Sequence, residues 1–235
     1  MTLNASGRSF APNYLNDLCL WLRADNVVLG GTNSNSVLQW SDMSGKQATN
    51  SFSGSLGTQP TMVFNDANFN GQSSILFNGT SQFLADATFS FGTGPDFFIW
   101  TVCKMIGSTG FPMIWSQGGV NELRGTNSTG APEFLTTAGT AIWGSSTVGA
   151  TKAYAAWDTT AGPVGISVSN GTPVTVAGTA GHAVSHAVPI NIGARPAPNN
   201  FANMKVAEFV VCTTMPSASD LQLLQTYATL RYGAV

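Results

Sequence analysis

Residues 206–233 read VAEFVVCTTMPSASDLQLLQTYATLRYG, and they join an apolar strand to an amphipathic helix. The segment 206–212 carries β-branched and aromatic side chains on both faces, which is typical of a central strand, and Glu208 is its only charge. Ser217 is a residue type that caps helix N-termini, and Gly233 is one that ends helices. Between them, apolar residues recur at helical spacing. We therefore predict a closing strand followed by one packed helix that ends at Gly233.

The composition is unusually poor in charge. Only 9% of the 235 residues are charged, and the formal net charge is −2. The nine basic residues are spread along the chain, so no basic stripe is available to neutralise phosphates, which argues against nucleic-acid binding. A weakly charged surface repels neighbouring copies little, so the composition favours self-association and a role as a component of an assembly.

The domain organisation follows from the absence of a linker. Residues 1–14 are polar and lack periodicity, so we expect an N-terminal arm there, followed by one domain over residues 15–235. The N-terminus has no apolar core of signal-peptide length, and no apolar run is long enough to cross a membrane. We therefore expect a soluble protein made in the cytosol, with no membrane partner.

Strand and turn signals fill the middle of the chain. Asn78–Gly79 separates two apolar runs, and Asn170–Gly171 follows the alternating segment 164–169. Asn-Gly is the strongest short hairpin signal. The run 97–105 is apolar on both faces, so its second face must also be covered. Short strands with Gly-rich turns and one terminal helix indicate an all-β sandwich.

Several motifs occur in the order seen in one family of β-sandwiches. They are LCLWLRADNV (18–27), VLQWSDMSG (37–45), SSILFNGTSQFL (73–84), VSNG (168–171), INIGAR (190–195) and the closing segment. Their order resembles concanavalin A-like (LamG-like) jelly-roll domains over almost the whole chain. The family's W-x-D-x-S-G turn, F-x-G turn and closing strand are matched by Trp40, Asp42, Ser44 and Gly45, by Phe77 and Gly79, and by Ala207 and Glu208.

This resemblance implies an all-β jelly-roll sandwich of two antiparallel sheets with a C-terminal α-helix. The family includes carbohydrate-binding modules, adhesion domains, some glycosidases and many bacteriophage tail and capsid-surface proteins. The fold itself does not choose among these functions.

The acidic residues argue against a glycosidase. A retaining glycosidase needs two carboxylates about 5 Å apart. The three glutamates, Glu122, Glu133 and Glu208, are isolated in the sequence, and no E-x-D-x-E string occurs. We therefore expect that the protein is not an enzyme and has no catalytic residues.

The histidines and aspartates do not predict a metal site. His182 and His186 would lie about 13 Å apart in an extended segment, too far to share one ion. Several LamG-like domains bind calcium through aspartates, and the candidates by type are Asp25, Asp42, Asp66 and Asp86. None has the clustered D-x-D-x-D spacing of a calcium loop, so we interpret them as turn-stabilising residues. We expect no metal and no cofactor.

Three cysteines occur, Cys19, Cys103 and Cys212, each within an apolar run. This placement is typical of buried free thiols, which behave as small hydrophobic residues.

A glycan site is suggested by two tryptophans that lie near amides. Trp115 precedes Gln117 and Asn121, and Trp143 precedes a pair of serines. Aromatic platforms flanked by amides are suited to sugars, and these four residues are our candidate carbohydrate-binding set. The alternative is that both tryptophans fill the sandwich core, as large aromatic side chains most often do.

The low charge, the start at Met1 and the single jelly roll favour a virion structural protein, specifically a bacteriophage capsid decoration (cement) protein. Its expected partners are the major capsid protein or other virion proteins. We expect a homotrimer in which the arm 1–14 reaches a neighbour, the trimer being inferred by analogy with other virion surface proteins. The alternative is a carbohydrate-binding or host receptor-binding module of a phage tail.

Overall fold

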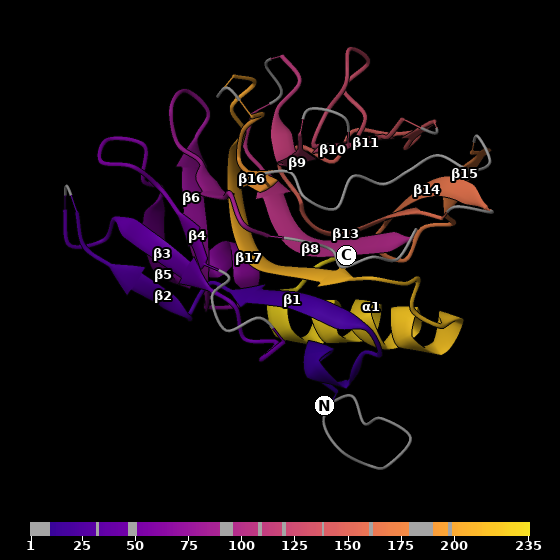
Figure 1. Cartoon of the computed structure of the whole chain (residues 1–235), viewed down its shortest axis with the longest axis horizontal. Coiled ribbons are helices and arrows are strands. Elements are labelled where there is room, and N and C mark those ends of the chain that lie inside the picture. The colour runs from indigo at the N-terminus through magenta and orange to yellow at the C-terminus, as the bar shows by residue number, and fades with distance from the viewer. Residues whose placement is uncertain are drawn as a thin grey trace.

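The computed structural model describes residues 10–31, 33–46, 51–89, 96–107, 110–118, 121–137, 139–159, 162–178, 190–196 and 199–235. Within these ranges the chain forms two antiparallel sheets and one C-terminal α-helix (Figure 1). The predicted all-β jelly-roll sandwich with a terminal helix is therefore confirmed. No helix among the described residues is long and apolar enough to cross a membrane.

The first sheet lies next to the helix. Its strands are β1 (Leu18–Arg23), β5 (Thr61–Asp66), β6 (Gln72–Asn78), β8 (Phe97–Met105), β13 (Thr151–Asp158), β14 (Pro163–Val168), β15 (Val174–Ala177) and β17 (Asn203–Cys212). They are ordered β15-β14-β13-β8-β17-β6-β5, and β1 pairs with the second half of β17. The closing strand is thus central, as its two apolar faces predict.

The second sheet is built from shorter strands. They are β2 (Val27–Leu29), β3 (Val37–Ser41), β4 (Ser51–Ser53), β7 (Leu84–Asp86), β9 (Met113–Gln117), β10 (Asn121–Arg124), β11 (Glu133–Leu135), β12 (Thr140–Ile142) and β16 (Ile190–Ile192). Their order is β12-β11-β10-β9-β16-β7-β4-β3-β2. Two short 3₁₀ turns, η1 (Pro12–Tyr14) and η2 (Ala67–Phe69), complete the described elements.

The helix α1 (Ala218–Tyr232) has the predicted boundaries. The Ser217 hydroxyl accepts a hydrogen bond from the Asp220 amide at 3.2 Å, and Gly233 ends the helix with a φ of 67°. Leu224, Ala228 and Tyr232 are its buried residues and face the first sheet. Figure 1 shows α1 lying against the sheet on the side away from the second sheet.

The described residues form two apolar cores. One fills the space between the sheets, and the other lies between the first sheet and α1. Strand β8 contributes to both: Phe97 and Ile99 belong to the first core, whereas Phe98 and Trp100 belong to the second. The helix therefore covers the second apolar face of β8, and that face requires no neighbouring copy. The homotrimer stays a prediction.

Part of the predicted arm packs onto its own chain. Phe10 is 5% exposed and meets the ring of Tyr227 edge-on, with ring centroids 6.1 Å apart. Residues 1–9 lie outside the described residues. The described end of the arm thus contacts α1 of the same molecule.

Candidate functional site

The four residues predicted to bind carbohydrate are not gathered on one surface. Trp115 is fully buried in the core between the sheets. Gln117 and Asn121 follow it closely in the sequence and are also buried. Asn121 Nδ2 donates a hydrogen bond of 2.9 Å to Gln117 Oε1. Only Trp143, which follows β12, is partly exposed and lines a cavity. Trp115 thus fills the sandwich core, which was the alternative to a role in sugar binding. Glycan binding by the four residues stays an untested prediction.

Trp143 stands beside the hairpin turn between β14 and β15. A Cβ atom built on Gly171 would lie 2.2 Å from the Trp143 ring, so glycine at this position is what permits the ring to pack against the turn. The Asn170–Gly171 signal in the sequence therefore has a second consequence besides the turn itself. It places an aromatic ring against a polar hairpin.

A cavity of about 310 Å³ opens next to this ring. Besides Trp143, it is lined by Ser145, Ser146, Lys152 and Asn170, which supply hydroxyl, ammonium and amide groups. Ser145, Ser146 and Asn170 are exposed. The cavity thus combines an aromatic wall with hydrogen-bonding groups at its open side.

A second cavity of about 190 Å³ lies on the other side of the same turn, against α1. Trp100 and two alanines provide its apolar wall, and Gln222 and Gln225 reach it from the helix. Both cavities are bounded by residues 169–171, so the turn is a shared wall between them. Among the described residues, Gln225 Nε2 is buried without a hydrogen-bond partner.

Two of the glutamates that are isolated in the sequence meet in the second sheet. The Arg124 guanidinium donates to Glu122 Oε2 at 2.5 and 2.8 Å and to Glu133 Oε2 at 2.9 Å. Arg195 donates to Glu122 Oε1 at 2.5 Å. The antiparallel register of β10 and β11 brings these residues together, because Arg124 lies opposite Glu133. The three glutamates are isolated in the sequence, but strand register places two of them around one arginine.

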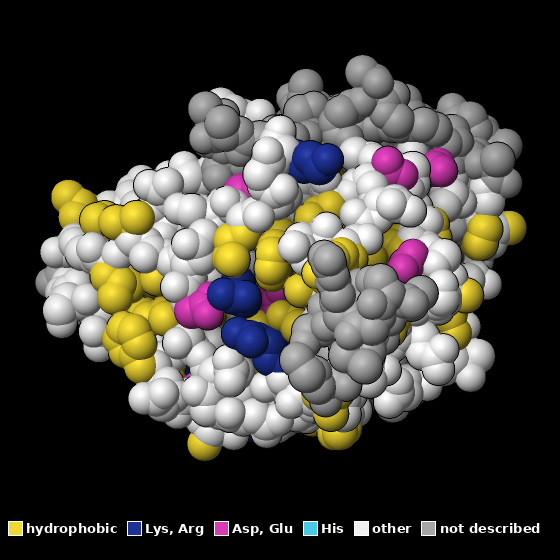
Figure 2. Space-filling model, turned by 90° about the horizontal axis from the view of Figure 1, so that it is seen from below, with side chains coloured by type: hydrophobic (Ala, Val, Ile, Leu, Met, Phe, Trp, Pro, Cys, Tyr) yellow, Lys and Arg dark blue, Asp and Glu magenta, His cyan; other side chains and the backbone are white. Residues whose placement is uncertain are grey.

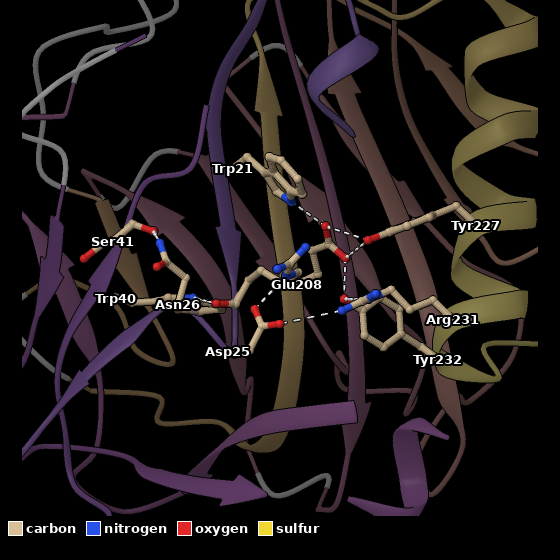
Figure 3. A network of polar contacts seen from close by, with 10 residues as sticks. Trp21, Asp25, Asn26, Trp40, Ser41, Glu208, Tyr227, Arg231 and Tyr232 are labelled. Atoms are coloured by element: carbon tan, nitrogen blue, oxygen red, sulfur yellow. Dashed lines mark hydrogen bonds and ion pairs between the residues drawn. The ribbon is translucent and has the colours of Figure 1, made fainter. Parts of the chain in front are cut away.

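The third glutamate, Glu208, is buried between the first sheet and α1 (Figure 3). Its carboxylate accepts hydrogen bonds from Trp21 Nε1, from the Tyr227 hydroxyl at 3.0 Å and from the Tyr232 hydroxyl at 2.5 Å. Burial raises the pKa of Glu208, and the three hydrogen bonds oppose this shift. The carboxylate ties the helix to β1 and β17.

The predicted turn aspartates each have a local partner. Asp42 accepts from the amides of Trp21 and Ser44 at 2.9 and 2.8 Å, which stabilises the W-x-D-x-S-G turn. The other three make short-range contacts of the same kind: Asp25 pairs with Arg23, Asp66 accepts from the amide of Asn68, and Asp86 accepts from those of Thr88 and Phe89. Within the described ranges, no group of three His, Cys, Asp or Glu side chains is placed to hold a metal ion.

The remaining candidates are the histidines and cysteines. His182 and His186 lie outside the described residues. Cys19, Cys103 and Cys212 are buried free thiols, as predicted. Burial raises the pKa of Cys212 to about 12 and those of the other two even further, so none forms a reactive thiolate near neutral pH.

No family model matches the chain, and no curated protein matches it. Solved structures do share its fold. It is similar to a sialidase of Trypanosoma rangeli in complex with sialic acid (TM-score 0.61, 13% identity, 89% of this chain covered) and to the receptor-binding domain of botulinum neurotoxin type G (0.57, 10%, 90%). A third similar structure concerns botulinum neurotoxin type C, whose cell entry depends on interaction with two ganglioside molecules (TM-score 0.56, 12% identity, 92% of this chain covered).

These comparisons cover only parts of the other proteins. The chain spans 32% of the sialidase and 51% and 52% of the two toxin chains. Identities this low show the fold alone.

The expectation that the protein is not an enzyme is corrected by the same findings. Sialidases are enzymes, and three of their structures share this fold over about 89% of the present chain. A shared fold does not assign an activity, and the chain spans only 32% of the first sialidase. The chain is an all-β sandwich of a kind found both in enzymes and in receptor-binding domains.

Proposed function

We propose that this domain binds a glycan, with one sugar ring seated against Trp143. The observation that carries the proposal is the cavity of about 310 Å³ at the β14–β15 turn, where an aromatic ring faces exposed hydroxyl and amide groups. The apolar face of a sugar packs on an aromatic ring, and its hydroxyls need hydrogen-bonding partners around the rim. Of the predicted carbohydrate-binding residues, Trp143 alone is retained in this site.

The structural comparisons support the same class of ligand. The similar sialidase is in complex with sialic acid, and cell entry of botulinum neurotoxin type C depends on interaction with two ganglioside molecules. Among the described residues, Lys152 is the one basic residue that lines the Trp143 cavity, and its ammonium already donates to the Val235 oxygen, so an acidic sugar would have to share it. The second cavity, which shares residues 169–171, would extend the site along an oligosaccharide.

The test is a titration with neutral and sialylated oligosaccharides, followed by tryptophan fluorescence and calorimetry. We expect at least one glycan to bind saturably and Trp143→Ala to weaken it by about tenfold or more, since a loss of 1.4 kcal/mol is tenfold in affinity. Ile142→Ala is the matched control, because Ile142 precedes Trp143, is 45% exposed and does not line the cavity. Binding that is unchanged in Trp143→Ala, or no binding across the panel, would contradict the proposal.

A second candidate is a structural role on a bacteriophage virion, as a capsid decoration protein bound to the major capsid protein or to other virion proteins. The low charge content of 9% favours it, because such a surface associates readily. Its test is the copy number in purified particles. A stoichiometry near that of the major capsid protein supports decoration, a few copies per particle supports a receptor-binding tail module, and absence from particles refutes both.

A further inference from the structure

A small cavity of about 100 Å³ lies where β1, the start of β6 and the end of α1 meet. It is lined by Arg23, Asp25, Gln72, Ser73, Arg231 and Tyr232. The two arginines are 208 positions apart in the chain and come together only because α1 packs against the first sheet. On the face covered by α1, basic side chains lie side by side next to an acidic one (Figure 2).

Both guanidinium groups are held by aromatic rings. Arg23 lies 5.6 Å from the centroid of the Trp21 ring, and Arg231 lies 5.4 Å from that of Tyr232. Arg231 Nε also donates to the Tyr232 hydroxyl at 3.0 Å. Stacking and the Arg231 Nε contact fix the planes of the guanidinium groups before any ligand arrives, which lowers the entropy cost of binding.

Asp25 lies close to both arginines, but only Arg23 is within hydrogen-bonding distance of it. Arg23 Nε donates to Asp25 Oδ1 at 2.6 Å, whereas Arg231 Nη2 is 3.7 Å from Asp25 Oδ2, beyond hydrogen-bonding distance. Figure 3 shows Asp25 and Arg231 facing one another across this gap. The Asp25 side chain is 41% exposed, so water competes for it.

The lining therefore carries two positive charges and one negative charge. Glu208 is not part of the lining, although its charge acts on Arg231, and its carboxylate accepts hydrogen bonds from Trp21, Tyr227 and Tyr232. The Ser73 hydroxyl and the Gln72 amide add uncharged donors. Guanidinium groups with neighbouring hydroxyl and amide donors are suited to bind carboxylate and phosphate oxygens.

The geometry points to a binding site for a small oxyanion, such as a carboxylate or phosphate group, between Arg23 and Arg231. The volume holds roughly three waters, since one water occupies about 30 Å³ in the liquid. An anionic head group fits this space. The site is separate from the Trp143 cavity and does not rest on the proposed function.

The experiment is a titration at constant ionic strength, followed by the NMR signal of the Trp21 indole N–H, because the Trp21 ring stacks with Arg23. One arm uses inorganic phosphate, and the other uses N-acetylneuraminic acid as a sugar-borne carboxylate. We expect a saturable shift. A shift with phosphate identifies a general anion site, and a shift with the sugar acid alone identifies a carboxylate site; both support the proposal.

Three variants sharpen the test. Arg23→Gln and Arg231→Gln should weaken binding by about tenfold each, because each removes charge-assisted hydrogen bonds. Asp25→Asn should tighten binding, because it removes the internal competitor, and a purely structural ion pair predicts no such gain. Lys46→Gln, an equal loss of charge at an exposed residue, should leave binding unchanged.

The proposal is overturned if neither anion gives a saturable shift, or if Arg23→Gln and Lys46→Gln behave alike. If Asp25→Asn does not bind the anion more tightly than the wild type, the proposal is overturned even if an arginine variant fails to fold. Trp143→Ala should leave the anion titration unaltered, so this result and that of the glycan proposal are distinguishable.

Discussion

Glu208→Ala should destabilise the protein by about 3 kcal/mol at neutral pH. The substitution removes the acceptor of Trp21 Nε1 and of the Tyr227 and Tyr232 hydroxyls. Trp21 and Tyr232 are 6% and 1% exposed, so water cannot easily replace the carboxylate, and each unpaired buried donor costs about 1–3 kcal/mol. Part of this loss is offset, because burying the carboxylate is itself unfavourable.

Glu208→Gln is the control for hydrogen bonding, since it keeps the shape and one acceptor oxygen. We expect it to cost less than half as much as Glu208→Ala. The assay is urea unfolding followed by tryptophan fluorescence and circular dichroism, with the free energy of unfolding obtained by linear extrapolation. A loss below about 0.5 kcal/mol for the alanine variant, or equal losses for both, would refute the role assigned to the network.

A comparison of the wild type with Glu208→Gln tests the raised pKa of Glu208. Because burial raises that pKa above its ordinary value of 4.5, the folded state holds the proton more tightly than the unfolded chain does. The contribution of protonated Glu208 to the free energy of unfolding is fully present below pH 4.5 and is lost as the pH rises through the folded pKa. The free energy of unfolding of the wild type relative to Glu208→Gln should therefore fall as the pH rises above 4.5.

Two further predictions concern other parts of the fold. Leu224→Ala should cost about 2–5 kcal/mol in unfolding free energy, because Leu224 is fully buried between α1 and the first sheet; a loss below about 0.5 kcal/mol would show that the helix is peripheral. Burial would raise the pKa of Asp66, but hydrogen bonds from Ser74, Lys205 and Asn68 outweigh it and lower the value to about 2. This stability is present above pH 3.8 and lost as the pH falls through about 2, so acid unfolding curves of the wild type and Asp66→Asn should converge there; parallel curves would contradict the assignment.

Local patterns predicted some elements of this fold, but the hairpin predicted at Asn78–Gly79 is wrong, because β6 and β7 pair with strands of different sheets. The helix that ends at Gly233, the turn at Asn170–Gly171 and the covered second face of β8 all follow from cap residues, turn residues and apolar periodicity. These signals act over a few residues along the chain, and they do not depend on which strands become neighbours. The buried thiols followed for the same reason, because each cysteine lies within an apolar strand.

The candidate sites depended on contacts between distant residues, and only the tertiary structure decided them. Periodicity does not distinguish a tryptophan that faces the core, such as Trp115, from one beside a cavity, such as Trp143, because both lie in or next to short strands. Glu122 and Glu133 share Arg124 only through strand register. Arg23 and Arg231 meet only because α1 folds back across the first sheet, an arrangement set by burial of apolar surface rather than by any local motif.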